Sequence, residues 1–146
     1  MPLGSVLQTA LSGIAAATAS VDAASNNLAN MRTNGFKATK PVVAEQAPTT
    51  ESIGSAPSEF EGGANPRQAG TGVRVVGYRT DDSPGPLVVE QDADGNDVLV
   101  ELSNTDVGEN LVELILAGDQ LRANAAVFDT AGALLDELIH LGRARD

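Results

Sequence analysis

Apolar residues recur at seven-residue spacing near both ends of the chain, and this repeat predicts two long helices. In the first stretch, from Ser5 to about Asn30, aliphatic positions alternate with alanines within each repeat. The large positions are Leu7, Ile14, Val21 and Leu28, and the small positions are Ala10, Ala17 and Ala24. A seam of large and small residues is typical of a helix that packs closely against a partner helix.

The C-terminal stretch repeats this pattern through five repeats of the same spacing. One series holds Val107, Leu114, Leu121, Phe128 and Leu135, and the interleaved series holds Leu111, Gly118, Ala125, Gly132 and Ile139. Asp106 is expected to cap the first turn, with Glu109 three residues later as its capping-box partner. A glycine costs about 1 kcal/mol against alanine in an exposed helix. Gly118 and Gly132 therefore indicate close helix contact, or alternatively two local weak points.

The middle of the chain lacks this periodicity. Residues 41–72 hold four prolines among Gly, Ser, Thr and Glu, which predicts an irregular loop. Short strands are expected at Gly72–Arg79, Leu87–Glu90 and Val98–Leu102, with a turn at Asp94-Gly95. The predicted fold is mainly α with a small β element, in which the terminal helices pair as a coiled coil. The predicted divisions are 1–40, 41–102 and 103–146.

Composition indicates a thin core and an acidic surface. The chain has 146 residues, of which 42% are hydrophobic but only 3% aromatic, and its formal net charge is −11. Because aromatic side chains dominate burial in most small domains, the monomer is expected to be marginally stable alone. An acidic surface repels phosphate backbones, so nucleic acid is not an expected partner. The apolar runs predict neither a secretory signal nor a membrane span.

Few residues are suited to catalysis or metal binding. The chain has no cysteine, and His140 is its only histidine. Asp92, Asp94 and Asp97 resemble a calcium loop only superficially, because Asp97 and Ser103 occupy the places of the required glycine and glutamate. We therefore predict no catalytic, cofactor or metal site and no small-molecule substrate, and the chain is not expected to be an enzyme.

The stretch from Ser25 to Lys37 reads as the end of a helix followed by a turn. Its asparagines can bond terminal carbonyls, and Asn34-Gly35 favours a turn in which Gly35 has a positive φ. Phe36 is expected to dock the outgoing chain against the helix. On physical grounds the stretch is a joint between a helix and the segment that leaves it.

This joint resembles the N-terminal signature of the flagellar basal-body rod protein family, the rod and hook axial proteins. The matching residues are Ser25, Asn26, Asn27, Leu28, Ala29, Asn30, Thr33, Gly35, Phe36 and Lys37. The C-terminal helix of the family is similar at Ser103, Asn104, Asp106, Val112, Ile115, Ala123, Asn124, Val127, Thr130, Ala131 and Leu135. The segment Gly118–Leu121 departs from the Gln-Arg-Ala-Tyr that the family commonly has there.

The resemblance implies a structural rod subunit, most like the short proximal members of the FlgC kind. Such a subunit would leave through the flagellar type III export apparatus without a cleaved signal peptide. It would then polymerise through its terminal helices, with itself and with other rod subunits, into the drive shaft in the basal body that spans the periplasm. The alternative is a soluble helical adaptor or export chaperone for flagellar axial proteins.

Overall fold

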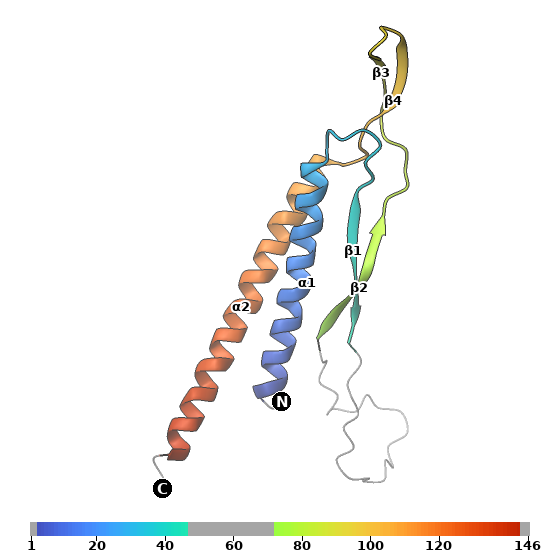
Figure 1. Cartoon of the computed structure of the whole chain (residues 1–146). Coiled ribbons are helices and arrows are strands. Elements are labelled where there is room, and N and C mark those ends of the chain that lie inside the picture. The colour runs from blue at the N-terminus through green and yellow to red at the C-terminus, as the bar shows by residue number, and fades with distance from the viewer. Residues whose placement is uncertain (1–2, 47–71, 144–146) are drawn as a thin grey trace, which may run out of the picture.

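The computed structural model describes residues 3–46 and 72–143 as two long helices and four short strands. The elements are α1 (Leu3–Ala29), β1 (Thr39–Glu45), β2 (Val73–Thr80), β3 (Leu87–Gln91), β4 (Asp97–Glu101) and α2 (Val107–Arg143). Figure 1 shows the helices side by side, with β3 and β4 beyond one end of the pair. The predicted mainly helical fold with a small antiparallel β element is confirmed.

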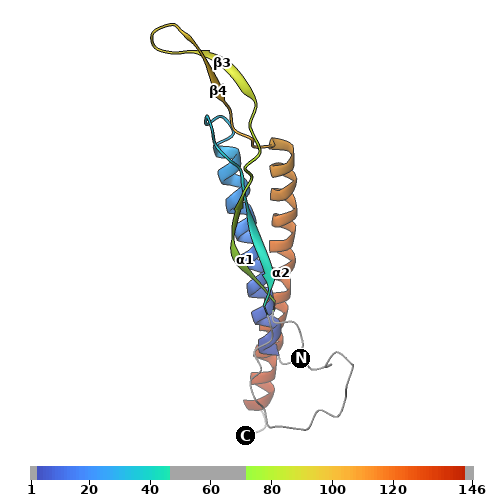
Figure 2. The same cartoon turned by 90° about the vertical axis from the view of Figure 1, so that its right-hand side faces the viewer.

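Helix α1 is the central element, because it packs against α2 on one side and against β1 and β2 on another. Figure 2, turned by 90°, shows the strands β1 and β2 lying along α1. The two helices run antiparallel, so the end of α1 meets the start of α2. Residues 27–40 and residues 101–110 are thereby brought together.

Every buried apolar side chain in the described ranges is an alanine. They are Ala10, Ala17, Ala19, Ala23, Ala24, Ala38, Ala117 and Ala131. Burying a methyl group contributes about 0.8 kcal/mol, against roughly 1.5–3 kcal/mol for a leucine or phenylalanine side chain. The core is therefore thin, as the composition predicts.

The predicted small positions of the first helix, Ala10, Ala17 and Ala24, all lie in this core. In α2 the buried side chains are Asn110, Ala117 and Ala131. They lie one residue before Leu111, Gly118 and Gly132 of the predicted seam, of which Gly118 and Gly132 are half-buried and Leu111 is exposed.

Close approach of the helices occurs at Gly13 and not at the glycines of α2. A Cβ atom at Gly13 would lie 2.6 Å from the side-chain amide of Asn124. A Cβ at Gly118 or Gly132 would meet nothing within 4 Å in this chain. A larger residue at position 13 must therefore push the helices apart or displace Asn124, while positions 118 and 132 have open space.

The strands form two separate antiparallel pairs, β1 with β2 and β3 with β4. The three predicted strands are observed within one residue of their expected bounds. Strand β1 was not predicted, because Pro41 suggested a loop; Pro41 instead lies opposite Tyr78 in a two-stranded pair, where a proline can be accommodated at an edge. The prediction of an irregular loop at 41–72 is thus corrected over 41–45, and its part at 47–71 lies outside the described residues.

Candidate functional site: an asparagine-rich joint

Four segments meet where α1 ends and α2 begins. They are the last turn of α1, residues 35–40, the connection at 81–86, and residues 101–110. Backbone hydrogen bonds link them: Gly35 donates to the Glu101 carbonyl at 2.8 Å, and Asp81 donates to the Ala38 carbonyl at 2.8 Å. From here on, the joint means this whole region, which includes the predicted joint from Ser25 to Lys37.

Asn27 lies at the centre of the joint and is 1% exposed. Its amide nitrogen donates to the Thr39 carbonyl at 2.8 Å and to Asn110 Oδ1 at 2.9 Å. Its Oδ1 accepts from the Thr39 backbone N–H at 2.9 Å. A single side chain thereby holds α1, β1 and α2 together, with its polar atoms paired as a buried amide requires.

Asn110 is the partner of Asn27 on α2 and is itself 4% exposed. Its amide nitrogen donates to the Asp106 carbonyl at 2.7 Å, one turn earlier in the helix. That bond orients the Asn110 oxygen toward Asn27. Without a donor from Asn27, this oxygen would be buried next to alanines.

Asn104 makes the second set of bonds across the joint. Its Oδ1 accepts from the Ala38 N–H at 2.8 Å, and its Nδ2 donates to the carbonyls of Asp81 and Ser83 at 2.7 and 3.0 Å. Its own N–H donates to the Phe36 carbonyl at 3.3 Å. Asn104 therefore joins three segments that are far apart in the sequence.

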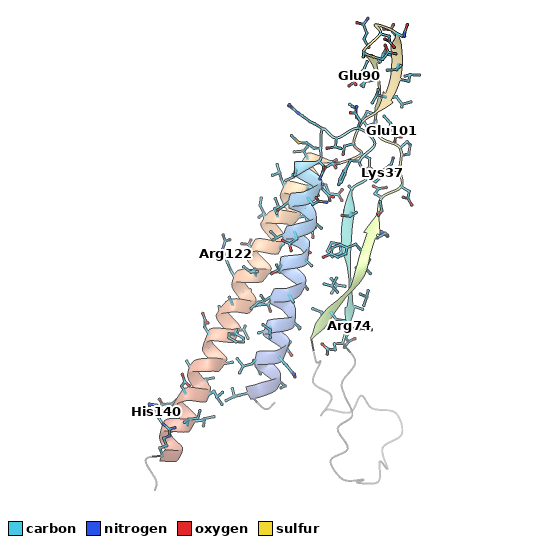
Figure 3. All side chains as sticks on the ribbon, in the orientation of Figure 1. Lys37, Arg74, Glu90, Glu101, Arg122 and His140 are labelled. Atoms are coloured by element: carbon cyan, nitrogen blue, oxygen red, sulfur yellow. The ribbon has the colours of Figure 1, made fainter. Side chains whose placement is uncertain are left out.

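Lys37 and Glu101 form an ion pair at the top of the joint, which Figure 3 labels. Lys37 Nζ lies 2.7 Å from Glu101 Oε1 and also donates to the Ser83 carbonyl at 2.8 Å. The same carboxylate oxygen accepts from the Gly85 N–H at 2.7 Å. The hydrogen bond from Lys37, followed by that from Gly85, lowers the pKa of Glu101 below its usual range.

The start of α2 is capped as predicted, but the capping box is not completed. Asp106 Oδ1 accepts from the Glu109 N–H at 2.9 Å. The Glu109 side chain instead pairs with Lys40 on β1. This pair adds a second charged link between β1 and α2, in an exposed position where such pairs contribute about 0–1 kcal/mol.

Local hydrogen bonds close the end of α1. Asn30 donates to the Asn26 carbonyl at 2.9 Å, and Thr33 Oγ1 donates to Asn30 Oδ1 at 3.1 Å. Gly35 has φ +69°, the left-handed conformation that the turn prediction requires. These bonds are exposed and local, whereas those of Asn27 are buried and long-range.

The structure separates the predicted joint residues into two groups. Asn27 and Lys37 bond to distant segments, and Gly35 does so through its backbone. Ser25, Asn26 and Ala29 are exposed at the end of α1, and Leu28 and Phe36 are half-buried. Sequence reasoning missed Asn110, although its seven-residue spacing from Ala117, Asn124 and Ala131 was a signal for it.

The Asp92 loop is a turn, as expected from Asp94-Gly95. Asp92 accepts hydrogen bonds from the N–H groups of Asn96 and Asp94, and the bond from Asn96 is the main reason its pKa is lowered. Within residues 3–46 and 72–143, no three His, Asp or Glu side chains gather as metal ligands. Neither helix in these ranges has an apolar stretch long enough to cross a membrane.

Residues 7–37 match a family model described as flagella basal body rod protein. The match covers most of α1 and runs through the turn to Lys37, so it includes Asn27 and Gly35. It confirms the resemblance of this segment to flagellar basal-body rod proteins, a structural family of the flagellar basal body. No curated protein matches the chain.

Proposed function

We propose that the chain is a structural subunit of the flagellar rod, of the short proximal FlgC kind, and that it polymerises through its terminal helices into the drive shaft for motility. The family match supports a rod-type role in general. The observation that carries the polymerisation step is the surface of α2, which exposes large apolar side chains over residues 107–116 and again over residues 127–141.

Helix α2 exposes many large apolar side chains to solvent in the isolated chain. They are Val107, Leu111, Val112, Ile115, Leu116, Val127, Phe128, Leu134, Leu135, Leu138, Ile139 and Leu141. We call them the outer apolar face of α2. Exposed apolar side chains in this number mark an interaction site. Several residues of the predicted seam, including Leu111 and Phe128, lie on this face and are available to a neighbouring subunit.

The thin core supports a mechanism in which folding is coupled to assembly. Alanine seams stabilise the isolated helix pair only weakly, so neighbouring subunits supply much of the burial that orders the helices. A loosely folded chain of this kind suits passage through the flagellar export apparatus, followed by assembly with itself and other rod subunits in the periplasm. In this role the chain is not an enzyme. The joint serves to align α1 with α2.

The proposal is tested by negative-stain microscopy and circular dichroism over rising protein concentration. We expect reduced helix content in dilute monomer, and gain of helix together with rod-like polymers as concentration rises. Full helix content with a cooperative melt in dilute monomer would contradict coupled folding. A fixed dimer without polymers would favour the adaptor or chaperone alternative.

A matched pair of variants tests the outer apolar face directly. Ile115→Ser with Leu138→Ser removes two exposed apolar side chains and should abolish polymers and motility. Asp129→Ser with Glu137→Ser changes two exposed polar residues of the same helix and should leave both intact. Equal behaviour of the two double variants would argue against this face as the assembly surface.

A further inference from the structure

The hairpin formed by β3 and β4 projects beyond the helices and exposes an apolar face (Figure 1). Leu87, Val89 and Leu99 are 64–72% exposed. Val89 lies opposite Leu99, and Leu87 is two residues from Val89 on the same strand, so the three share one side of the hairpin. An isolated two-stranded hairpin is marginally stable in water. This hairpin therefore needs a surface that covers its apolar side.

The charge of the hairpin restricts what that surface can be. Residues 87–101 contain no Lys or Arg, and their acidic residues are Glu90, Asp92, Asp94, Asp97 and Glu101. Asp92 is bonded within the turn and Glu101 within the joint. Asp97 is two residues from Leu99 and shares its side of the hairpin, whereas Glu90, next to Val89, lies on the other side. The covering surface must therefore combine apolar side chains with positive charge.

The pair of strands β1 and β2 has this combination. Val42 and Val76 are 41% and 47% exposed. Arg74 and Arg79 are exposed on β2, and Arg79 lies opposite Lys40, two residues from Val42, so Arg79 and Val42 share one face. Apart from Lys40 and Glu45, the two strands carry no other charged residue.

The two hairpins cannot cover each other within one copy. They make no contact in the described structure, and Figure 3 shows Glu90 and Arg74 at opposite ends of the β portion. Both hairpins lie on the same side of the helix pair, one beyond the other along its length. A second copy shifted along this direction would bring its β1 and β2 to the first copy's β3 and β4.

We propose that the β3–β4 hairpin of one copy docks on the β1–β2 strands of the next copy. Leu87, Val89 and Leu99 pack against Val42 and Val76, and Asp97, which shares their side of the hairpin, faces Arg74 and Arg79. The contact joins two different surfaces, so it leaves a free surface at each end and extends without closing. It rests on the proposed polymerisation and adds an axial contact to the helix contacts.

Engineered cysteines test this contact, because the natural chain has none. Leu99→Cys and Val76→Cys in the same chain should give a ladder of disulfide-linked oligomers under mild oxidation. Either single cysteine variant should give no disulfide-linked oligomer. A matched control with cysteines at Asp129 and Val76 should give no ladder.

Charge reversal then separates specific docking from random collision. Arg74→Glu with Arg79→Glu should abolish the ladder of the double-cysteine chain. Adding Asp97→Arg in that chain should restore it, because opposite charges again face each other. A ladder that survives the first reversal, or is not restored by the second, overturns the charge pairing and with it the proposed docking.

The remaining outcomes distinguish this inference from the proposed function. Dimers from Leu99→Cys alone would show that the hairpin pairs with its own copy, which overturns the docking on β1 and β2. Wild-type polymers without a cysteine ladder would overturn the docking and leave polymerisation standing. A ladder from a chain that forms no polymers would support the docking and overturn the proposed function. If the chain forms neither polymers nor a cysteine ladder, both the docking and the proposed function are overturned.

Discussion

Replacing Asn27 by alanine removes the central bonds of the joint. The buried Asn27 side chain makes three hydrogen bonds, two with the Thr39 backbone and one with Asn110. At about 1 kcal/mol of net stabilisation for each bond, their loss should lower the free energy of unfolding by about 3 kcal/mol. The residue is buried, so water cannot fully replace the lost partners.

The measurement is urea unfolding followed by circular dichroism, at a concentration where the wild-type chain melts cooperatively. Asn26→Ala is the matched control, since Asn26 belongs to the same motif but is exposed; it should change stability by no more than about 0.5 kcal/mol. A cycle with Asn110→Ala should give a coupling energy of about 1 kcal/mol. An Asn27→Ala variant as stable as the Asn26→Ala control would refute the central role of Asn27.

Three further predictions use the same unfolding measurement. Gly13→Leu should lower the free energy of unfolding by about 1–3 kcal/mol through overpacking against Asn124. Gly118→Leu should not lower it, because nothing lies within 4 Å of the Cβ position at Gly118. Equal losses in the two variants would contradict the close approach of the helices at Gly13. Gly35→Val should cost about 2 kcal/mol because Gly35 has φ +69°, and Gly35→Asn should be tolerated; an unaffected valine variant would show that the turn relaxes. The pKa of Glu101 is lowered on folding from 4.5, so its stabilisation is present above that pH and is lost as the pH falls through the folded pKa. Glu101→Gln should therefore make stability fall less steeply in acid, and an unchanged slope would exclude Glu101 as a contributor.

The helices could be predicted from the sequence because their repeat persists over many turns. The predicted seam of α2 follows apolar and glycine positions and therefore leaves out Asn110 and Asn124, which lie on the side of α2 that contacts α1. A repeat search that counts only apolar residues misses a face that uses asparagine. β1 was missed because Pro41 belongs to the proline- and glycine-rich segment 41–72, which predicts a loop.

The joint was predictable only in part. The local turn at Gly35 follows from Asn-Gly chemistry, and the burial of Asn27 does not. Asn27 bonds to Asn110, which is 83 residues away, and Lys37 bonds to Glu101, which is 64 residues away. No spacing rule connects such partners, because their contact depends on how α1 and α2 are aligned.

That alignment raises the question of what fixes the register of two alanine-lined helices. Alanines are nearly uniform in shape, so the alanine positions alone do little to oppose a slide of one helix by seven residues, about 10 Å. Asn27 and Asn110 oppose this slip, because it would separate their buried amides. Gly13 opposes it too, since it leaves space for Asn124 in one register. Buried polar residues are known to specify register in coiled coils at some cost in stability.

We therefore expect a chain with alanine at positions 27, 110 and 124 to remain helical but to lose its single register. Spin labels on cysteines introduced at the exposed positions Thr18 and Asp119 report the alignment of α1 and α2 through their distance distribution. The wild-type background should give one narrow distance, and the triple alanine variant should give a broad or second distance. Asn26→Ala with Asn30→Ala removes two asparagines from the same helix end and should keep the narrow distance. One narrow distance in the triple variant would mean that the alanine seams alone set the register.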